Sequence, residues 1–219
     1  MERDTLYKDE VLEVTFDIAK SVNNNGLMFN ERYLHHFFSS LLHDRHNLLD
    51  LTKDRTEIVL HPEWPTYKKQ TGLLFGRYKR KNRKYLPDVN GAAGFVDFAI
   101  GNYYRPDIGI EFTLKFGWSH EEIIYDFLKL LDNRNPFKTS ISLNFILRHL
   151  GLVSGKSLKN LEDHMNKAFK EATERLEKEI TSSRELYFIV VELDKDNNRR
   201  FWSYDRITNK FERGLPVIH

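Results

Sequence analysis

Two short apolar segments on either side of a turn constrain the fold of this chain more than any other feature. Residues 108–115 alternate strictly, which places Ile108, Ile110, Phe112 and Leu114 on one face and Gly109, Glu111, Thr113 and Lys115 on the other. Such alternation is typical of a strand with one buried face. The preceding segment 95–100 predicts a buried strand, and the turn-forming residues of 101–107 connect the two. Together they predict an antiparallel hairpin.

The hairpin brings two acids together. If its turn is centred on residue 104, Asp97 lies directly opposite Glu111, with Cβ atoms about 4.5–5.5 Å apart. Carboxylates that close repel each other unless a cation lies between them or one of them takes up a proton. Mg²⁺ prefers oxygen ligands and keeps waters for substrate phosphates, so the pair is a candidate metal site. The alternative is the solvated face of an ordinary hairpin, on which acid, threonine and lysine are common.

The other segments complete an α/β pattern. Asn30 is placed to cap a helix striped by apolar residues between Tyr33 and Leu42, and Ser119 with Glu122 forms a capping box before another helix. Further strands are expected at 57–61, 72–78, 141–147, 186–193 and 201–204, and a long helix at 158–180. This order predicts a mixed central sheet flanked by helices. We expect a single α/β domain over 1–219, with a C-terminal helix and strands in 156–205.

Composition excludes several classes of protein. The chain has 219 residues, of which 40% are hydrophobic, so it is long and apolar enough for a substantial core. It contains no cysteine, which excludes disulfides, thiolate zinc sites and cysteine nucleophiles, and fits a reducing compartment. The charged start lacks the apolar region of a secretory signal, and no apolar run reaches the roughly 18 residues that span a bilayer. We expect a soluble, cytoplasmic protein with no membrane partner.

One basic segment stands out against a formal net charge of only +2. Residues 76–85 contain no acid and carry Arg77, Lys79, Arg80, Lys81, Arg83 and Lys84. Such a run is suited to contact the phosphates of a nucleic acid. A solvated loop is the alternative interpretation.

The sequence GFVDFAIG followed by IGIEFTLKFGW resembles the core of the PD-(D/E)XK nuclease superfamily, which has the restriction-endonuclease-like fold. Asp97 matches the first acid of that family and Glu111 the second, and Glu31 lies where many members carry a further acid on an N-terminal helix. The resemblance covers most of residues 30–147. It implies a divalent-metal-dependent nuclease that acts on DNA rather than RNA, with Mg²⁺ (or Mn²⁺) held by these three acids. It leaves a homodimer open.

Two positions depart from the family pattern. Val96 precedes the first acid in place of proline, and Thr113 occupies the position of the family lysine. Lys115 lies on the same face of the strand and could substitute for that lysine across an offset of roughly 6.5–7 Å, with Thr113 as a supporting contact. If it cannot, the chain is a catalytically decayed module that binds nucleic acid or protein on the same fold.

Other polar residues have ordinary interpretations. In the rigid segment 61–65, Glu63 could supply a further ligand and Trp64 could stack on a base, but such segments more often pack the aromatic ring into the core. His36, His43 and His46 share one side of the first predicted helix, and we expect partly exposed residues rather than a metal site. Asp126 and Lys129 are interpreted as ordinary surface charges on the helix after the hairpin; the alternative is that Lys129 faces the phosphate backbone of a nucleic acid.

Overall fold

The computed structural model describes residues 3–23, 30–46, 59–66, 77–115, 120–147, 161–176, 184–194 and 196–216. Its helices are α1 (Arg3–Ser21), α3 (Glu31–His46), α4 (His120–Leu131) and α5 (Leu161–Leu176). Its strands are β1 (Leu60–Pro65), β2 (Arg77–Lys81), β3 (Lys84–Pro87), β4 (Ala92–Ala93), β5 (Phe95–Asn102), β6 (Arg105–Lys115), β7 (Thr139–Leu147), β8 (Glu185–Leu193), β9 (Arg199–Asp205) and β10 (Lys210–Arg213).

A seven-stranded mixed sheet forms the centre of the molecule, in the order β1-β5-β6-β7-β8-β9-β10. Strand β5 is antiparallel to both β1 and β6, whereas β6, β7 and β8 run parallel and β9 reverses again. Every residue of β7 is buried, as expected for a strand covered on both faces. A second sheet, β3-β2-β4, lies beside it. The predicted α/β class with a mixed sheet flanked by helices is confirmed.

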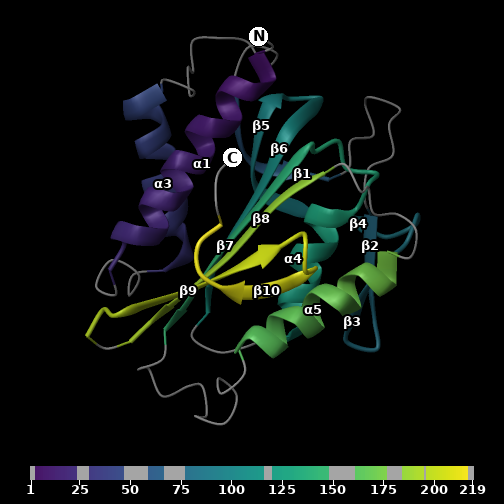
Figure 1. Ribbon diagram of the computed structural model, residues 1–219. Coiled ribbons are helices and arrows are strands. Elements are labelled where there is room, and N and C mark those ends of the chain that lie inside the picture. Colours follow the sequence, from purple (N-terminus) through teal and green to yellow (C-terminus); the bar gives the residue numbers. More distant parts are fainter. Residues whose placement is uncertain are drawn as a thin grey trace.

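Helices cover both faces of the large sheet, which gives three layers (Figure 1). Helices α1 and α3 pack on one face, where the apolar set Ile108, Ile110, Phe112 and Leu114 of β6 joins their core. Helices α4 and α5 pack on the other face, in a second core that includes Phe127, Phe188 and Phe211. The strict alternation along β6 therefore decides which layer each of its side chains enters.

The predicted hairpin and its register are confirmed. Phe98 pairs with Ile110 and Ile100 with Ile108, followed by a bulge at Gly101, whose φ of 115° suits glycine. The ladder ends at Phe98–Ile110, one step before the two acids. There the backbone N–H of Phe112 donates to Asp97 Oδ2 at 2.6 Å instead. The strands therefore separate where Asp97 and Glu111 lie.

Other predicted elements are found with changed limits. The Asn30 cap is confirmed, because Asn30 Oδ1 accepts the backbone N–H of Tyr33 at 3.2 Å. The strand expected at 57–61 begins at Leu60 and continues to Pro65, and residues 57–58 lie outside the described ranges. Ser119 and residues 72–76 are outside them too. Strand β10 was not predicted. Among the described helices, none is long and apolar enough to cross a bilayer.

The basic segment is a β-hairpin, so its interpretation as a loop is wrong. Strands β2 and β3 pair around a turn at Asn82 and Arg83, whose φ angles are 50° and 65°. Two successive residues with positive φ make the kind of tight turn that matches the twist of a hairpin. Only Tyr78 of β2 is buried, and the three residues after it are all exposed, so the strand carries no alternating pattern that the sequence could reveal.

Candidate functional site

A lysine from α4 lies on the acidic strand pair. The Nζ atom of Lys129 contacts Glu111 Oε1, lies 3.2 Å from Asp126 Oδ1 and donates to the carbonyl of Phe95 at 2.9 Å. Thr113 Oγ1 donates to Asp126 Oδ2 at 3.2 Å. We call Glu111, Thr113, Asp126 and Lys129 the Lys129 cluster. It joins β6 to α4 with a cation surrounded by carboxylates.

Local sequence makes room for this lysine. Asp126 and Lys129 are three residues apart and therefore share one side of α4. The lysine stem passes close to Gly94, where an added Cβ would lie 3.0 Å from both Lys129 Cγ and Cδ. Its ammonium lies 5.0 Å from the centre of the Tyr125 ring. Glycine before β5 and an aromatic ring on α4 thus bound the space that the lysine occupies.

Burial and charge set the protonation of the Lys129 cluster. Burial alone would lower the pKa of Lys129, but the carboxylates of Glu111 and Asp126 outweigh it and raise that pKa above its ordinary value. Burial raises the pKa of Glu111 well above its usual range; Lys129 opposes this rise, whereas Asp97 and Asp126 add to it. Lys129 is therefore a fixed positive charge, and the acids around it outnumber it.

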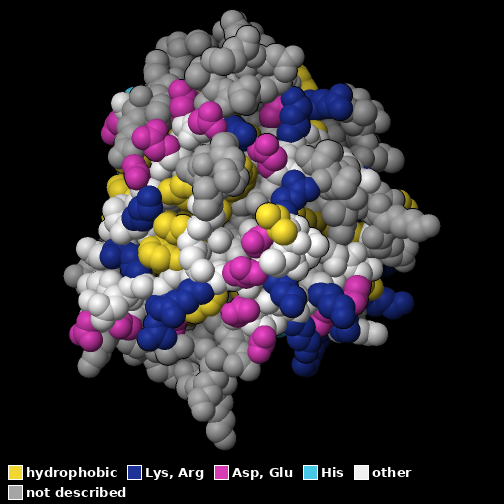
Figure 2. All heavy atoms as spheres, viewed as in Figure 1, with side chains coloured by type: hydrophobic (Ala, Val, Ile, Leu, Met, Phe, Trp, Pro, Cys, Tyr) yellow, Lys and Arg dark blue, Asp and Glu magenta, His cyan; other side chains and the backbone are white. Residues whose placement is uncertain are grey.

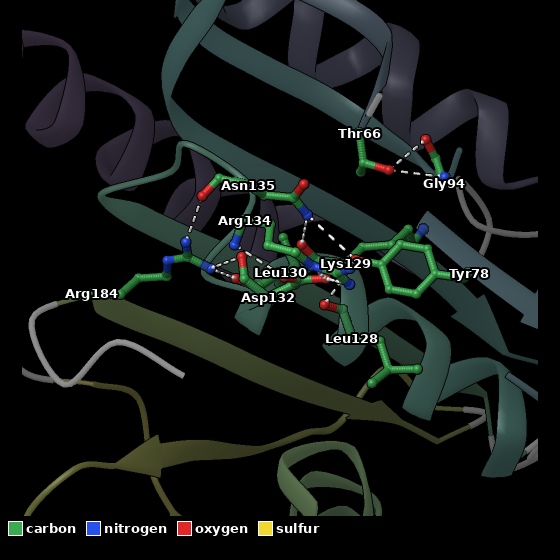
Figure 3. Close-up of polar contacts among 10 residues, drawn as sticks. All are labelled: Thr66, Tyr78, Gly94, Leu128, Lys129, Leu130, Asp132, Arg134, Asn135 and Arg184. Carbon is green, nitrogen blue, oxygen red and sulfur yellow. Dashed lines mark hydrogen bonds and ion pairs between the residues drawn. The ribbon is translucent and has the colours of Figure 1, made fainter. Parts of the chain in front are cut away.

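A polar network holds the end of α4 that carries Lys129 (Figure 3). The buried guanidinium of Arg184 donates to four backbone carbonyls just beyond Lys129, those of Leu130, Asp132, Asn135 and Phe137. Asn135 Nδ2 donates to the Lys129 carbonyl at 2.7 Å, and the Tyr78 hydroxyl donates to Asp132 Oδ2 at 3.1 Å. These contacts satisfy carbonyls that the helix end leaves without partners and fix the position of Lys129.

A second group of side chains lies next to Asp97 from the opposite layer. One ligand atom from each of His35 on α3, Glu63 on β1 and Asp97 on β5 lies within 4.8 Å of the others. His35 Nε2 is 3.3 Å from Asp97 Oδ2. We call these three residues the His35 cluster. Burial alone would lower the pKa of His35, but the adjacent carboxylate of Asp97, with the charges of Glu31 and Glu63, raises it.

The predicted site residues are placed as follows. Asp97, Glu111 and Thr113 come together, and the charge of Asp97 acts on both Glu111 and Lys129. Glu31 lies beside them, with Oε2 accepting the Leu114 N–H at 3.0 Å. The backbone of Lys115 ends β6, but its side chain is outside the described part of the chain.

Sequence reasoning missed Lys129. Its interpretation as surface charge is wrong, because Lys129 is only 5% exposed. Every residue from Phe127 to Leu131 in the last turn of α4 is buried. The apolar residues on one side of a helix predict burial of that side alone, and Lys129 lies outside it. The one signal was Asp126 with Lys129 at a spacing of three on the helix after the acidic strand.

The remaining candidates separate into structural and site residues. Trp64 is fully buried and donates to the Tyr103 carbonyl at 2.8 Å, which confirms that its ring packs in the core. Glu63 beside it is exposed and belongs to the His35 cluster. His36 and His43 are exposed on α3, as expected. The side chain of His46 lies outside the described residues.

The basic hairpin lies on the α4 side of the molecule. Five of its six cations are exposed: Lys79, Arg80, Lys81, Arg83 and Lys84. Tyr85 of β3 stacks on Tyr125 of α4, with ring centres 4.0 Å apart, and Tyr125 in turn contacts Lys129. Figure 2 shows Lys and Arg side chains along the lower right, where Figure 1 places α5 in front of β2 and β3. The hairpin is therefore joined to the Lys129 cluster through two aromatic rings.

No family model, no curated protein and no solved structure matches this chain.

Proposed function

We propose that this chain is a divalent-metal-dependent nuclease of the restriction-endonuclease-like PD-(D/E)XK class, acting on DNA rather than RNA. The observation that carries it is Lys129. The strand position where the family has its lysine holds Thr113, but the ammonium of Lys129 reaches Glu111 from the next helix. A cation beside two acids suits metal-assisted phosphodiester cleavage, in which acids hold the ion and a cation stabilises the developing negative charge.

The charge and burial of each side chain indicate its role in the proposed reaction. Asp97 and Glu111 supply carboxylate oxygens, which suit Mg²⁺ or Mn²⁺, and Glu31 lies near enough to assist. A divalent ion bound there would polarise the phosphate and lower the pKa of water. Lys129 stays protonated, so it cannot accept a proton from water; it stabilises the negative charge that develops on the phosphate oxygens. Thr113 orients Asp126, which holds the ammonium in place.

The hairpin β2–β3 binds the nucleic-acid substrate. Its exposed cations suit the phosphate backbone of nucleic acid, and its link through Tyr85 and Tyr125 brings bound phosphates towards Lys129. A cysteine-free chain suits a reducing compartment, so a cytoplasmic location goes with this function. A homodimer would fit an enzyme that cuts both strands of a duplex.

Cleavage of mixed substrates tests the function. Supercoiled plasmid, linear duplex, single-stranded DNA and RNA are incubated with Mg²⁺, Mn²⁺ or EDTA. We expect metal-dependent cleavage that is lost in Asp97→Asn. Asp107→Asn is the matched control, because Asp107 is an acid of the same hairpin at its other end, paired with Lys138 at 3.0 Å. Circular dichroism verifies that both variants are folded.

Each result has a clear meaning. Cleavage that survives in Asp97→Asn would place the active site elsewhere. Absence of cleavage on every substrate, with nucleic-acid binding retained, would favour the catalytically decayed binding module.

A further inference from the structure

The three side chains of the His35 cluster come from three different elements and lie close together beside the Asp97–Glu111 pair. His35 comes from α3, Glu63 from β1 and Asp97 from β5, and their ligand atoms lie within 4.8 Å of one another. Only Asp97 belongs to the acid pair that the hairpin sequence predicts. We propose that these residues form a site for a divalent transition-metal ion, with Mn²⁺ favoured over Mg²⁺. The site shares Asp97 with the carboxylate pair of the proposed nuclease and adds His35 and Glu63 as ligands, so it rests on the proposed function and extends it.

The histidine ring is held with one nitrogen aimed at Asp97. Its ring packs edge-on against Phe98, with ring centres 5.4 Å apart, and lies 6.2 Å from the centre of Phe112. The Nε2 atom is buried and, among the described residues, makes no hydrogen bond of good geometry; its contact is Asp97 Oδ2 at 3.3 Å. Two neighbouring ligands of one ion, with bonds of about 2.0–2.1 Å, are themselves about 2.8–3.0 Å apart in octahedral and about 3.3–3.4 Å apart in tetrahedral geometry. The observed separation of 3.3 Å falls in the tetrahedral range.

Glu63 is presented by a strained backbone. Its φ of 50° is unusual for a residue with a side chain, and such conformations persist only where neighbouring contacts enforce them. Those contacts are present on both sides. The ring of His61 contacts the Gly101 carbonyl at 2.9 Å, and Trp64 donates to the Tyr103 carbonyl. The result is an exposed carboxylate between two anchored residues, directed to His35 and Asp97.

Asp97 is fixed before any ion binds. Its Oδ2 accepts the Phe112 N–H at 2.6 Å, in the space where the β5–β6 ladder has ended. Its side chain is 14% exposed and that of His35 is 20% exposed, so the cluster is open to solvent on the Glu63 side. The ligands are thus largely preorganised, and an ion has a path to them.

The donor set selects the class of ion. Carboxylates suit Mg²⁺ and Mn²⁺ alike, whereas an imidazole nitrogen suits first-row transition metals such as Fe²⁺ and Zn²⁺ and is rarely a ligand of Mg²⁺. Two carboxylates with one imidazole therefore suit Mn²⁺ and its neighbours in that row. The anionic charge of Glu63 and Asp97 adds affinity for any divalent ion, but only His35 supplies discrimination between Mn²⁺ and Mg²⁺.

Direct binding of Mn²⁺ tests the inference without any nuclease assay. Free Mn²⁺ is followed by electron paramagnetic resonance while the protein is titrated, and Mg²⁺ is added as a competitor. We expect Mn²⁺ to bind at least tenfold more tightly than Mg²⁺. His35→Gln should weaken Mn²⁺ binding by about tenfold or more and remove most of that preference, and Glu63→Gln should weaken it as well. His36→Gln is the matched control, because His36 is the adjacent, exposed histidine on α3.

The outcomes separate this inference from the proposed function. Equal affinities for the two ions, or unchanged Mn²⁺ binding in a folded His35→Gln variant, would overturn the metal site. Mn²⁺ binding that depends on His35, in a protein that cleaves no substrate, would establish the site and remove the nuclease function. Cleavage that depends on Asp97 while His35→Gln binds Mn²⁺ normally would do the reverse.

Discussion

The Lys129 cluster and the His35 cluster lie on opposite faces of the sheet. Each brings carboxylates close together, and the two differ in how the repulsion between those carboxylates is balanced. In the Lys129 cluster the protein supplies its own cation, and the side chains of Lys129 and Glu111 are 7% and 4% exposed. In the His35 cluster two carboxylates face a single imidazole at a position open to solvent. Asp97 belongs to the second cluster, and its charge acts on the first. The Lys129 cluster therefore carries a cation of the protein itself, whereas the His35 cluster is the one for which we propose a bound metal ion.

Removing the cation of the Lys129 cluster should cost the most stability. Lys129→Met leaves the buried Glu111 and the half-buried Asp126 without their cation, so we expect a loss of unfolding free energy on the order of 3–5 kcal/mol in urea denaturation. Adding Glu111→Gln to this variant should recover part of the loss. Lys138→Met is the control, because Lys138 is an exposed lysine in a surface pair, worth about 0–1 kcal/mol. Equal losses in the two lysine variants would mean that the Lys129 cluster is not a buried ion pair.

The second prediction tests whether the Lys129 cluster and the His35 cluster are independent of each other. Arg184→Met removes donors from four carbonyls at the end of α4, so we expect a loss on the order of 3 kcal/mol by urea denaturation. Arg184 lies at the end of α4 and His35 on α3, which cover opposite faces of the sheet, so Mn²⁺ affinity should be unchanged in the folded variant. Arg213→Met, on exposed Arg213 of β10, is the control. A parallel loss of Mn²⁺ affinity would show that the two clusters form a single unit.

The sequence predicts one part of the site and not the other, for a physical reason. Alternation along β6 and the turn at 101–107 are local patterns, and they correctly place Asp97 near Glu111. Lys129 is buried because Tyr78 of the second sheet and Arg184 pack around the end of α4, contacts that span 50 or more residues. Glu63 meets His35 only because β1 pairs with β5. Long-range contacts of this kind leave no periodic trace in the sequence.

The third prediction concerns the metal ion that we propose for the His35 cluster. Mn²⁺ at about 100 times its dissociation constant should raise the unfolding free energy by about 2.7 kcal/mol, because it binds the folded chain alone. Asp97→Asn should remove this gain, since Asp97 is shared by the ligand group, while Asp107→Asn should retain it. Thermal unfolding with and without Mn²⁺ measures the difference. A gain that persists in Asp97→Asn would move the ion to another part of the molecule.

The smallest effect on stability concerns the hairpin that we propose brings substrate to the Lys129 side. Lys79, Arg80 and Lys81 are exposed, so changing all three to glutamine should alter the unfolding free energy by only about 0.5 kcal/mol. Each cation that neutralises a phosphate contributes about 0.9 to the dependence of log affinity on log salt, so the slope for duplex DNA should become shallower. Mn²⁺ affinity should stay the same, because the hairpin stacks on Tyr125 and not on α3. An unchanged salt slope would mean that this hairpin does not contact the phosphate backbone of the DNA.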